Sequence, residues 1–131
     1  MKCMEFRYLV TAPELNSHGT LHGGVLMRWI DEAAGMHARK LTNRVCVTRF
    51  MENVSFISKA KLGDILLITT ELTDVGTSSL AFNVIAYEDI SARQIAVVKK
   101  IVFVSIDHQG NKVNLIASIC FPCVPSRRRV K

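Results

Sequence analysis

The chain has 131 residues, of which 49% are hydrophobic and 21% charged, which excludes a disordered chain and favours one globular domain over residues 1–131. No apolar run approaches the roughly 18 residues that cross a bilayer, and the first ten residues lack the apolar core of a secretory signal, so we expect a cytoplasmic protein without a membrane partner. The formal net charge of +6 includes a basic tail from about residue 121, but basic and aromatic residues do not alternate, so we expect no nucleic-acid partner.

The first predicted element is a strand over residues 3–10, which is followed by Pro13. A glycine pair then precedes a helix over residues 25–40, and its apolar stripe lies within about 60° of Leu26, at Trp29, Ile30, Ala33 and His37. Strands rich in Val, Ile, Thr and Phe are predicted over residues 45–56, 64–73, 78–87 and 94–107. The last strand carries bulk on both faces, which predicts a central position.

These elements predict an α+β fold in which a curled antiparallel sheet wraps around one long helix. The predicted strands follow one another with short turns between them, as antiparallel neighbours do. A single helix covers only one face of such a sheet. The apolar residues on the other surfaces therefore suggest a partner subunit.

The segment from Asn16 to Arg39 carries the candidate chemistry. Gly23 and Gly24 allow a sharp turn that leaves backbone N–H groups accessible, and the helix N-terminus behind them favours a carbonyl oxygen that gains negative charge. Asp31 lies about two turns further along the helix, at the edge of its buried face. An amide, a helix N-terminus and a carboxylate could together polarise a carbonyl and activate a water molecule.

The same residues also have simpler interpretations. Asp31 could form a surface ion pair with Arg28, and Asn16 could be a turn residue that bonds its own backbone. His18 and His22 are four residues apart, but glycines interrupt any helix there and no third ligand is evident, so we predict no metal site.

Two further residue pairs resemble functional motifs without completing them. Cys120 and Cys123 form a lone C-F-P-C, which lacks both a second ligand pair for zinc and the strand-to-helix context of a redox pair. Ser78 and Ser79 have no His–Asp partners nearby and no nucleophile elbow, which argues against a serine hydrolase.

Taken together, the motifs resemble the acyl-CoA hydrolase family of hotdog-fold thioesterases over roughly residues 11–113. The matching positions are Glu14 (in place of the commoner Asp), Asn16, Gly19, Gly23, Gly24, residues 31–35, Val47, Thr48, Phe56, Gly63, Asp64 and residues 76–79. The chain departs from the family at Lys59, where Pro is common, and at Thr77, where Arg is common. The second departure concerns one contact to coenzyme A.

The resemblance implies hydrolysis of acyl-CoA to a free fatty acid and coenzyme A, with no cofactor beyond the coenzyme A of the substrate. It assigns Asp31 as general base or nucleophile, places Asn16 opposite it to hold the water or the thioester, and directs the N–H groups of Gly23 and Gly24 at the carbonyl oxygen. The residues expected to bind coenzyme A are Gly76, Thr77, Ser78, Ser79, Lys59 and Lys61. The implied assembly is a homodimer, often within a trimer of dimers, so that Asn16 and Asp31 of one site can come from different subunits.

Two other functions remain as alternatives on the same fold. A non-catalytic acyl-CoA-binding module that serves regulation has little need for Asp31, because binding alone does not require a carboxylate at the edge of a buried face. A dehydratase that acts on acyl chains usually pairs a histidine with an acid, and no histidine stands at the position of Asp31.

Overall fold

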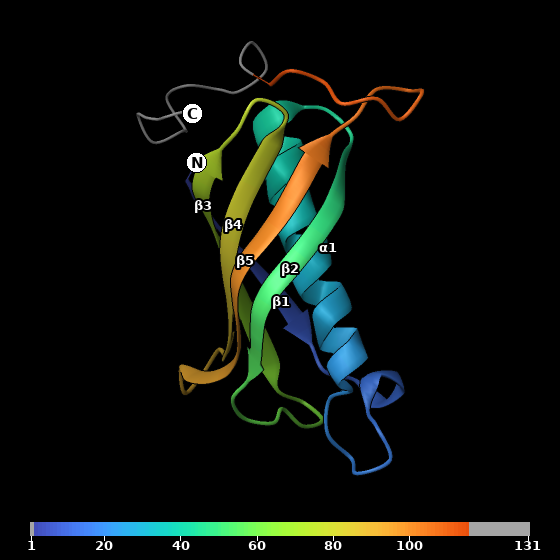
Figure 1. The fold of residues 1–131 in the computed structure, drawn as a ribbon. Helices are drawn as coiled ribbons and strands as arrows, with labels where there is room; N and C mark the ends of the chain where they lie inside the picture. The colour runs from blue at the N-terminus through green and yellow to red at the C-terminus, as the bar shows by residue number, and fades with distance from the viewer. Residues whose placement is uncertain (1, 116–131) are drawn as a thin grey trace.

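The computed structural model describes residues 2–115 and consists of one sheet and one long helix (Figure 1). The elements are β1 (Cys3–Leu9), a short 3₁₀ helix η1 (Ala12–Glu14), α1 (Gly23–Thr42), β2 (Cys46–Phe56), β3 (Ile65–Val75), β4 (Ser79–Glu88) and β5 (Arg93–Ser105). The sequence predicted every one of these except η1. The C-F-P-C motif at Cys120 and Cys123 and the basic tail lie outside the described residues.

The five strands form a single antiparallel sheet in the order β1-β3-β4-β5-β2, which curls around α1 (Figure 1). The predicted curled sheet around one helix is thus confirmed. β5 lies inside the sheet, between β4 and β2, although the middle strand is β4. The edge strands are β1 and β2.

The helix begins and ends with specific caps, which explains why it is longer than the apolar stripe predicted. Nδ1 of His22 accepts a hydrogen bond from the backbone N–H of Gly24 (2.8 Å), and Asn43 closes the last turn in the left-handed conformation at φ 54°. The buried face includes Ile30, Ala33 and His37. Small side chains on this face let α1 lie close to the sheet.

His37 is fully buried on the apolar stripe, and its Nδ1 lies 2.8 Å from Oγ1 of Thr70 on β3. Its ring also packs at a tilt against Phe82 of β4, with 4.9 Å between the ring centroids. This confirms that His37 is a core residue, as the stripe indicated.

Within residues 2–115, none of the helices has the length and hydropathy that a membrane span requires.

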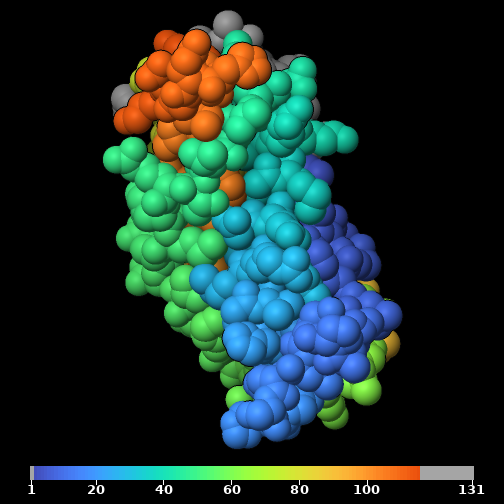
Figure 2. All heavy atoms as spheres, turned by 90° about the vertical axis from the view of Figure 1, so that its right-hand side faces the viewer, coloured from blue at the N-terminus to red at the C-terminus, as the bar shows by residue number. Residues whose placement is uncertain are grey.

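The sheet leaves one side of the helix uncovered. In Figure 2, α1 is visible at the surface between β2 (green) and β1 (dark blue). On and beside β2, large apolar side chains are exposed, among them Val45, Val47, Phe50, Phe56 and Ile57. An edge strand with exposed apolar residues is a surface on which a further strand can pair.

Candidate active site

Asn16 organises the loop before the helix with both ends of its side-chain amide. Oδ1 accepts hydrogen bonds from the backbone N–H groups of His18 (2.9 Å) and Thr20 (3.1 Å), and Nδ2 donates to Oγ1 of Thr20 (3.1 Å). Oδ1 of Asn16 thus has the local structural role in the turn that the simpler interpretation expected. One hydrogen of Nδ2 is engaged by Thr20, and the amide has a second hydrogen with which it can donate.

At the start of α1, the two glycines differ. The N–H of Gly24 is already used by His22, as described above, whereas the N–H of Gly23 has no hydrogen-bond partner in the described part of the chain. A Cβ at Gly23 would meet the ring of Phe56, from the end of β2, at 3.8 Å. Gly23 is therefore the residue whose backbone donor is ready for a ligand, in a corner formed by α1 and Phe56.

Asp31 is half-buried on the flank of α1, and its Oδ1 accepts a hydrogen bond from the hydroxyl of Thr48 on β2. The simpler interpretation of Asp31, an ion pair with Arg28, is wrong, because Arg28 pairs with Glu32 instead (3.6 Å). Within residues 2–115, Asp31 has no salt-bridge partner. A carboxylate that keeps one free oxygen while a hydroxyl fixes the other is suited to take a proton from water.

Thr48 is the functional candidate that sequence reasoning assigned no role. The register of β2 against β5 shifts between Thr48 and Phe50, which marks a β-bulge. Thr48 directs its hydroxyl at α1, while Arg49 and Phe50 both line a hollow on the other face of the sheet. The bulge thus accompanies a change of face along β2, with Thr48 directed at α1 and Arg49 and Phe50 at the opposite face of the sheet.

Asn16 and Asp31 do not meet within one protomer. At about 1.5 Å of rise per residue, Asp31 lies about 12 Å along the axis from Gly23. Asn16 lies in the loop between η1 and α1, before that end of the helix. No hydrogen bond between the two side chains is among the interactions of residues 2–115. The prediction that one site combines them depends on a second protomer.

The residues predicted to bind coenzyme A fall into two groups at opposite ends of the molecule. Lys59 and Lys61 lie beside the helix start, since the N–H of Leu21 donates to the carbonyl oxygen of Ala60 (2.8 Å). The turn of residues 76–79 lies at the far end of β3, which has 11 residues and spans about 35 Å. A single protomer therefore does not bring both groups to one ligand.

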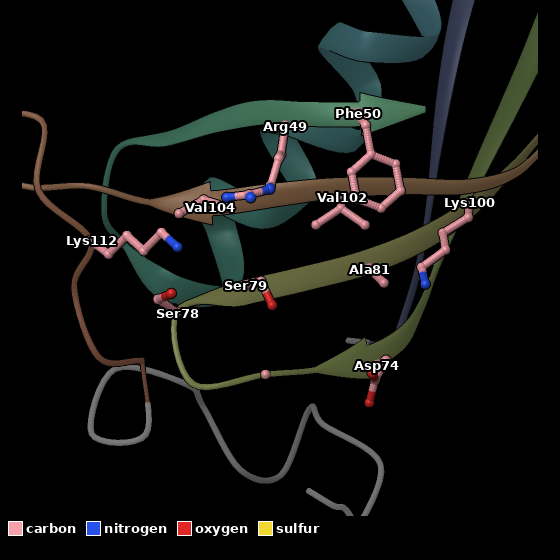
Figure 3. Close-up of a pocket in the computed structure, with 11 residues that line it drawn as sticks. Arg49, Phe50, Asp74, Ser78, Ser79, Ala81, Lys100, Val102, Val104 and Lys112 are labelled. Carbon is pink, nitrogen blue, oxygen red and sulfur yellow. The ribbon is translucent and has the colours of Figure 1, made fainter. Parts of the chain in front are cut away.

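The turn of residues 76–79 borders the hollow on the outer face of the sheet, which has a volume of about 320 Å³ (Figure 3). Ser78 and Ser79 line one end of it. The strands β2 and β5 and the chain after β5 contribute cationic and apolar residues that sequence reasoning did not connect with this turn: Arg49, Phe50, Lys100, Val102, Val104 and Lys112.

The described cysteines and carboxylates offer no competing chemistry. Burial raises the pKa of the Cys46 thiol, which disfavours the nucleophilic thiolate, and Cys3 is a free, exposed thiol at the start of β1. Among the described residues, no group of three His, Cys, Asp or Glu side chains could hold a metal ion.

The family model described as the thioesterase superfamily matches residues 18–91, more than half of the chain. The chain belongs to this superfamily. Its fold is the hotdog fold: the structure titled a hexameric hotdog fold thioesterase of Campylobacter jejuni superposes with a TM-score of 0.76 at 23% identity, over 86% of this chain and 89% of that one.

Two relatives are more similar in sequence. An uncharacterized acyl-CoA thioester hydrolase of Bacillus subtilis, YkhA, is 32% identical over 103 residues, which cover 76% of this chain and 60% of the relative. The chain thus spans less than two thirds of the length of that relative. An acyl-CoA hydrolase from Staphylococcus aureus, solved with butyryl coenzyme A, coenzyme A and coenzyme A disulfide, superposes with a TM-score of 0.76 at 30% identity, over 87% of this chain and 69% of that one.

Proposed function

We propose that this protein is an acyl-CoA thioesterase that hydrolyses acyl-CoA to a fatty acid and coenzyme A. The observation that carries the proposal is the hydrogen bond from the Thr48 hydroxyl to the Asp31 carboxylate on the open flank of α1. This hydrogen bond holds the Asp31 carboxylate beside an uncovered surface. Asp31 is not part of the buried core and has no ion-pair partner among the described residues, so neither explains its presence.

Three variants of the Staphylococcus aureus enzyme support the choice of residues. In these variants, an asparagine, an aspartate or a threonine is replaced by alanine, and the three positions follow one another at intervals of 15 and 17 residues. Asn16, Asp31 and Thr48 stand at the same intervals. We assign these three residues to the corresponding positions of the site.

In the proposed reaction, Asp31 takes a proton from a water molecule while the water oxygen bonds to the thioester carbon. The carbonyl oxygen becomes negative and accepts a hydrogen bond from the N–H of Gly23 of the second protomer, at the positive end of that protomer's helix. When the tetrahedral intermediate collapses, the carbon–sulfur bond breaks and the thiolate takes up the proton. Because a thiolate leaves readily, the site needs no strong general acid. An attack by Asp31 itself, through an anhydride, is the second form of the same proposal.

We propose a homodimer as the working unit and a trimer of dimers as the full assembly. The support is the exposed apolar edge of β2 and the separation of Asn16 from Asp31 within one protomer. A second copy at this edge can bring its Asn16 and Gly23 toward the Asp31 of the first. The Campylobacter jejuni relative is described as hexameric.

We place the reaction in the cytoplasm, where Cys3 and Cys46 would remain reduced.

The test is thiol release from acyl-CoA substrates of graded chain length by the purified protein, measured with a chromogenic thiol reagent. The proposal expects turnover that is saturable in acyl-CoA. The alternative, a regulatory module that binds acyl-CoA without hydrolysing it, expects tight binding of acyl-CoA in a titration and no thiol release.

A further inference from the structure

We propose that the hollow on the outer face of the sheet binds the phosphorylated nucleotide end of coenzyme A, and that Arg49 and Lys112 supply the cations for its phosphates. This inference rests on the proposed function and deepens it. It assigns a role to residues of β2 and of the chain after β5, in place of the turn residue Thr77.

The two cations face each other at one end of the hollow. In Figure 3, the side chain of Arg49 and that of Lys112 extend from opposite sides toward Val104, and the hydroxyl groups of Ser78 and Ser79 lie beside them. A guanidinium, an ammonium and two hydroxyl groups are the donors that a phosphate accepts from.

Neither cation is neutralised by another of the described residues. Within residues 2–115, the side chains of Arg49 and Lys112 form no salt bridge and no hydrogen bond. Lys100, by contrast, is 3.9 Å from a carboxylate oxygen of Glu52, and Asp74 is the acidic residue of the lining, near Lys100 (Figure 3). The excess positive charge is therefore at the end formed by Arg49 and Lys112, which attracts an anion.

The rest of the hollow suits an aromatic base. Phe50 is 42% exposed, and its ring lies beside Val102 and Ala81 on the floor (Figure 3). The ammonium of Lys100 lies 5.9 Å from the centre of the Phe50 ring, which keeps that ring in an open, polar setting. Phe50 directly follows Arg49 in the chain. An exposed aromatic ring beside a cation that can bind phosphate is a combination that binds nucleotides by stacking and by charge.

The bulge in β2 explains why the cation comes from the sheet. It turns Arg49 and Phe50 to the outer face, whereas an uninterrupted strand would alternate them. In the turn of residues 76–79, Thr77 is uncharged and does not line the hollow. The positive charge beside this turn therefore comes from Arg49 on β2, across β5 from Ser79, and from Lys112.

The experiment compares two substrates that carry the same acyl group. One is the acyl-CoA, and the other is the acyl thioester of N-acetylcysteamine, which has no nucleotide and no phosphate. Arg49→Gln, Lys112→Gln and the double variant are the test proteins. Lys99→Gln is the matched control, because Lys99 is an exposed lysine on β5 that does not line the hollow.

We expect each single variant to raise KM for acyl-CoA about tenfold, which corresponds to about 1.4 kcal/mol of lost binding, and the double variant to raise it further. kcat should change less than about twofold, and kcat/KM for the truncated thioester should stay at the wild-type value. Lys99→Gln should behave as wild type. Thermal unfolding midpoints check that all variants are folded.

The inference is overturned if the double variant leaves KM for acyl-CoA unchanged, or if the truncated thioester loses as much kcat/KM as acyl-CoA does. The inference can be tested even if the proposed function fails. If the wild type hydrolyses neither thioester, a titration with coenzyme A still tests whether the hollow binds the nucleotide. In that titration, wild type and Lys99→Gln must bind at least about tenfold more tightly than Arg49→Gln and Lys112→Gln, and equal affinities contradict it.

Discussion

Thr48 on the edge strand and Asp31 on the helix are joined by a hydrogen bond in which the hydroxyl donates to the carboxylate. The two residues are 17 positions apart in the chain and come from α1 and β2, which lie side by side at the open side of the helix (Figure 2). The contact fixes the direction of the carboxylate relative to the strand edge. The geometry of the site therefore depends on how β2 is bent.

Replacing Thr48 with valine should lower kcat by about 10- to 100-fold, because a hydrogen bond to a charged group contributes about 1.5–3 kcal/mol. KM should change little, since the hydroxyl orients Asp31 and does not bind the substrate. Thr48→Ser keeps the hydroxyl and should retain most of the activity. Steady-state kinetics of both variants check this, and a Thr48→Val enzyme as active as Thr48→Ser would refute the orienting role.

Substitutions at Asn16 separate its structural role from its role in catalysis. Asn16→Asp keeps an oxygen for the N–H groups of His18 and Thr20 but removes the amide donor. We expect this variant to unfold within a few degrees of wild type and to lose at least about tenfold in kcat/KM. Asn16→Ala should lose both stability and activity. If Asn16→Asp remained fully active, the amide would have only the structural role.

The β4–β5 turn gives a pH-dependent contribution to stability through Glu88. Its carboxylate accepts hydrogen bonds from the hydroxyl of Ser91 and from the backbone N–H groups of Ser91 and Ile90, which lower its pKa below the ordinary 4.5. A lowered pKa in the folded state stabilises the protein above the unfolded-state pKa, and this stabilisation is lost as the pH falls through the folded-state value.

Glu88→Gln should therefore unfold at a lower temperature than wild type at pH 7, and the difference should shrink as the pH falls below about 4.5. Thermal unfolding followed by circular dichroism at several pH values measures it. A difference between the two proteins that did not depend on pH would show that the charge of Glu88 contributes nothing.

Charges placed on the edge of β2 should separate the subunits. Val45 and Val47 are exposed and apolar, just before and within the start of β2. The double substitution Val45→Lys and Val47→Lys opposes pairing of this edge with a second strand. We expect the double variant to lose mass in sedimentation and to lose activity together. Ile90→Lys is the control, because Ile90 is 86% exposed in the turn at the far end of the sheet from Val45. A monomeric double variant with full activity would contradict a shared site.

The periodicity of the sequence was enough to predict the elements, because the apolar stripe of α1 and the alternation along the strands report burial directly. The caps at His22 and Asn43 extended α1 beyond that stripe. The partners of Asp31 were not predictable in the same way. Arg28 was the nearest cation in sequence, but the i+4 neighbour Glu32 engages it.

The roles of Thr48 and Arg49 depend on the bulge, which no pattern in the sequence marks. The separation of Lys61 from Gly76, in contrast, was readable, since a predicted strand of about ten residues lies between them and holds its ends about 33 Å apart. The grouping of both with one coenzyme A followed from the family resemblance and not from the geometry of one protomer.

The most direct measurement is the turnover of Asp31→Asn, which keeps the size of the side chain and the hydrogen bond from Thr48 but cannot accept a proton or attack a carbonyl. If the Asp31 carboxylate drives the hydrolysis, kcat for acyl-CoA should fall by at least about 1000-fold, while the affinity for coenzyme A and the oligomeric mass stay at their wild-type values. A variant that retains more than about a tenth of the wild-type kcat would show that another group carries out the reaction.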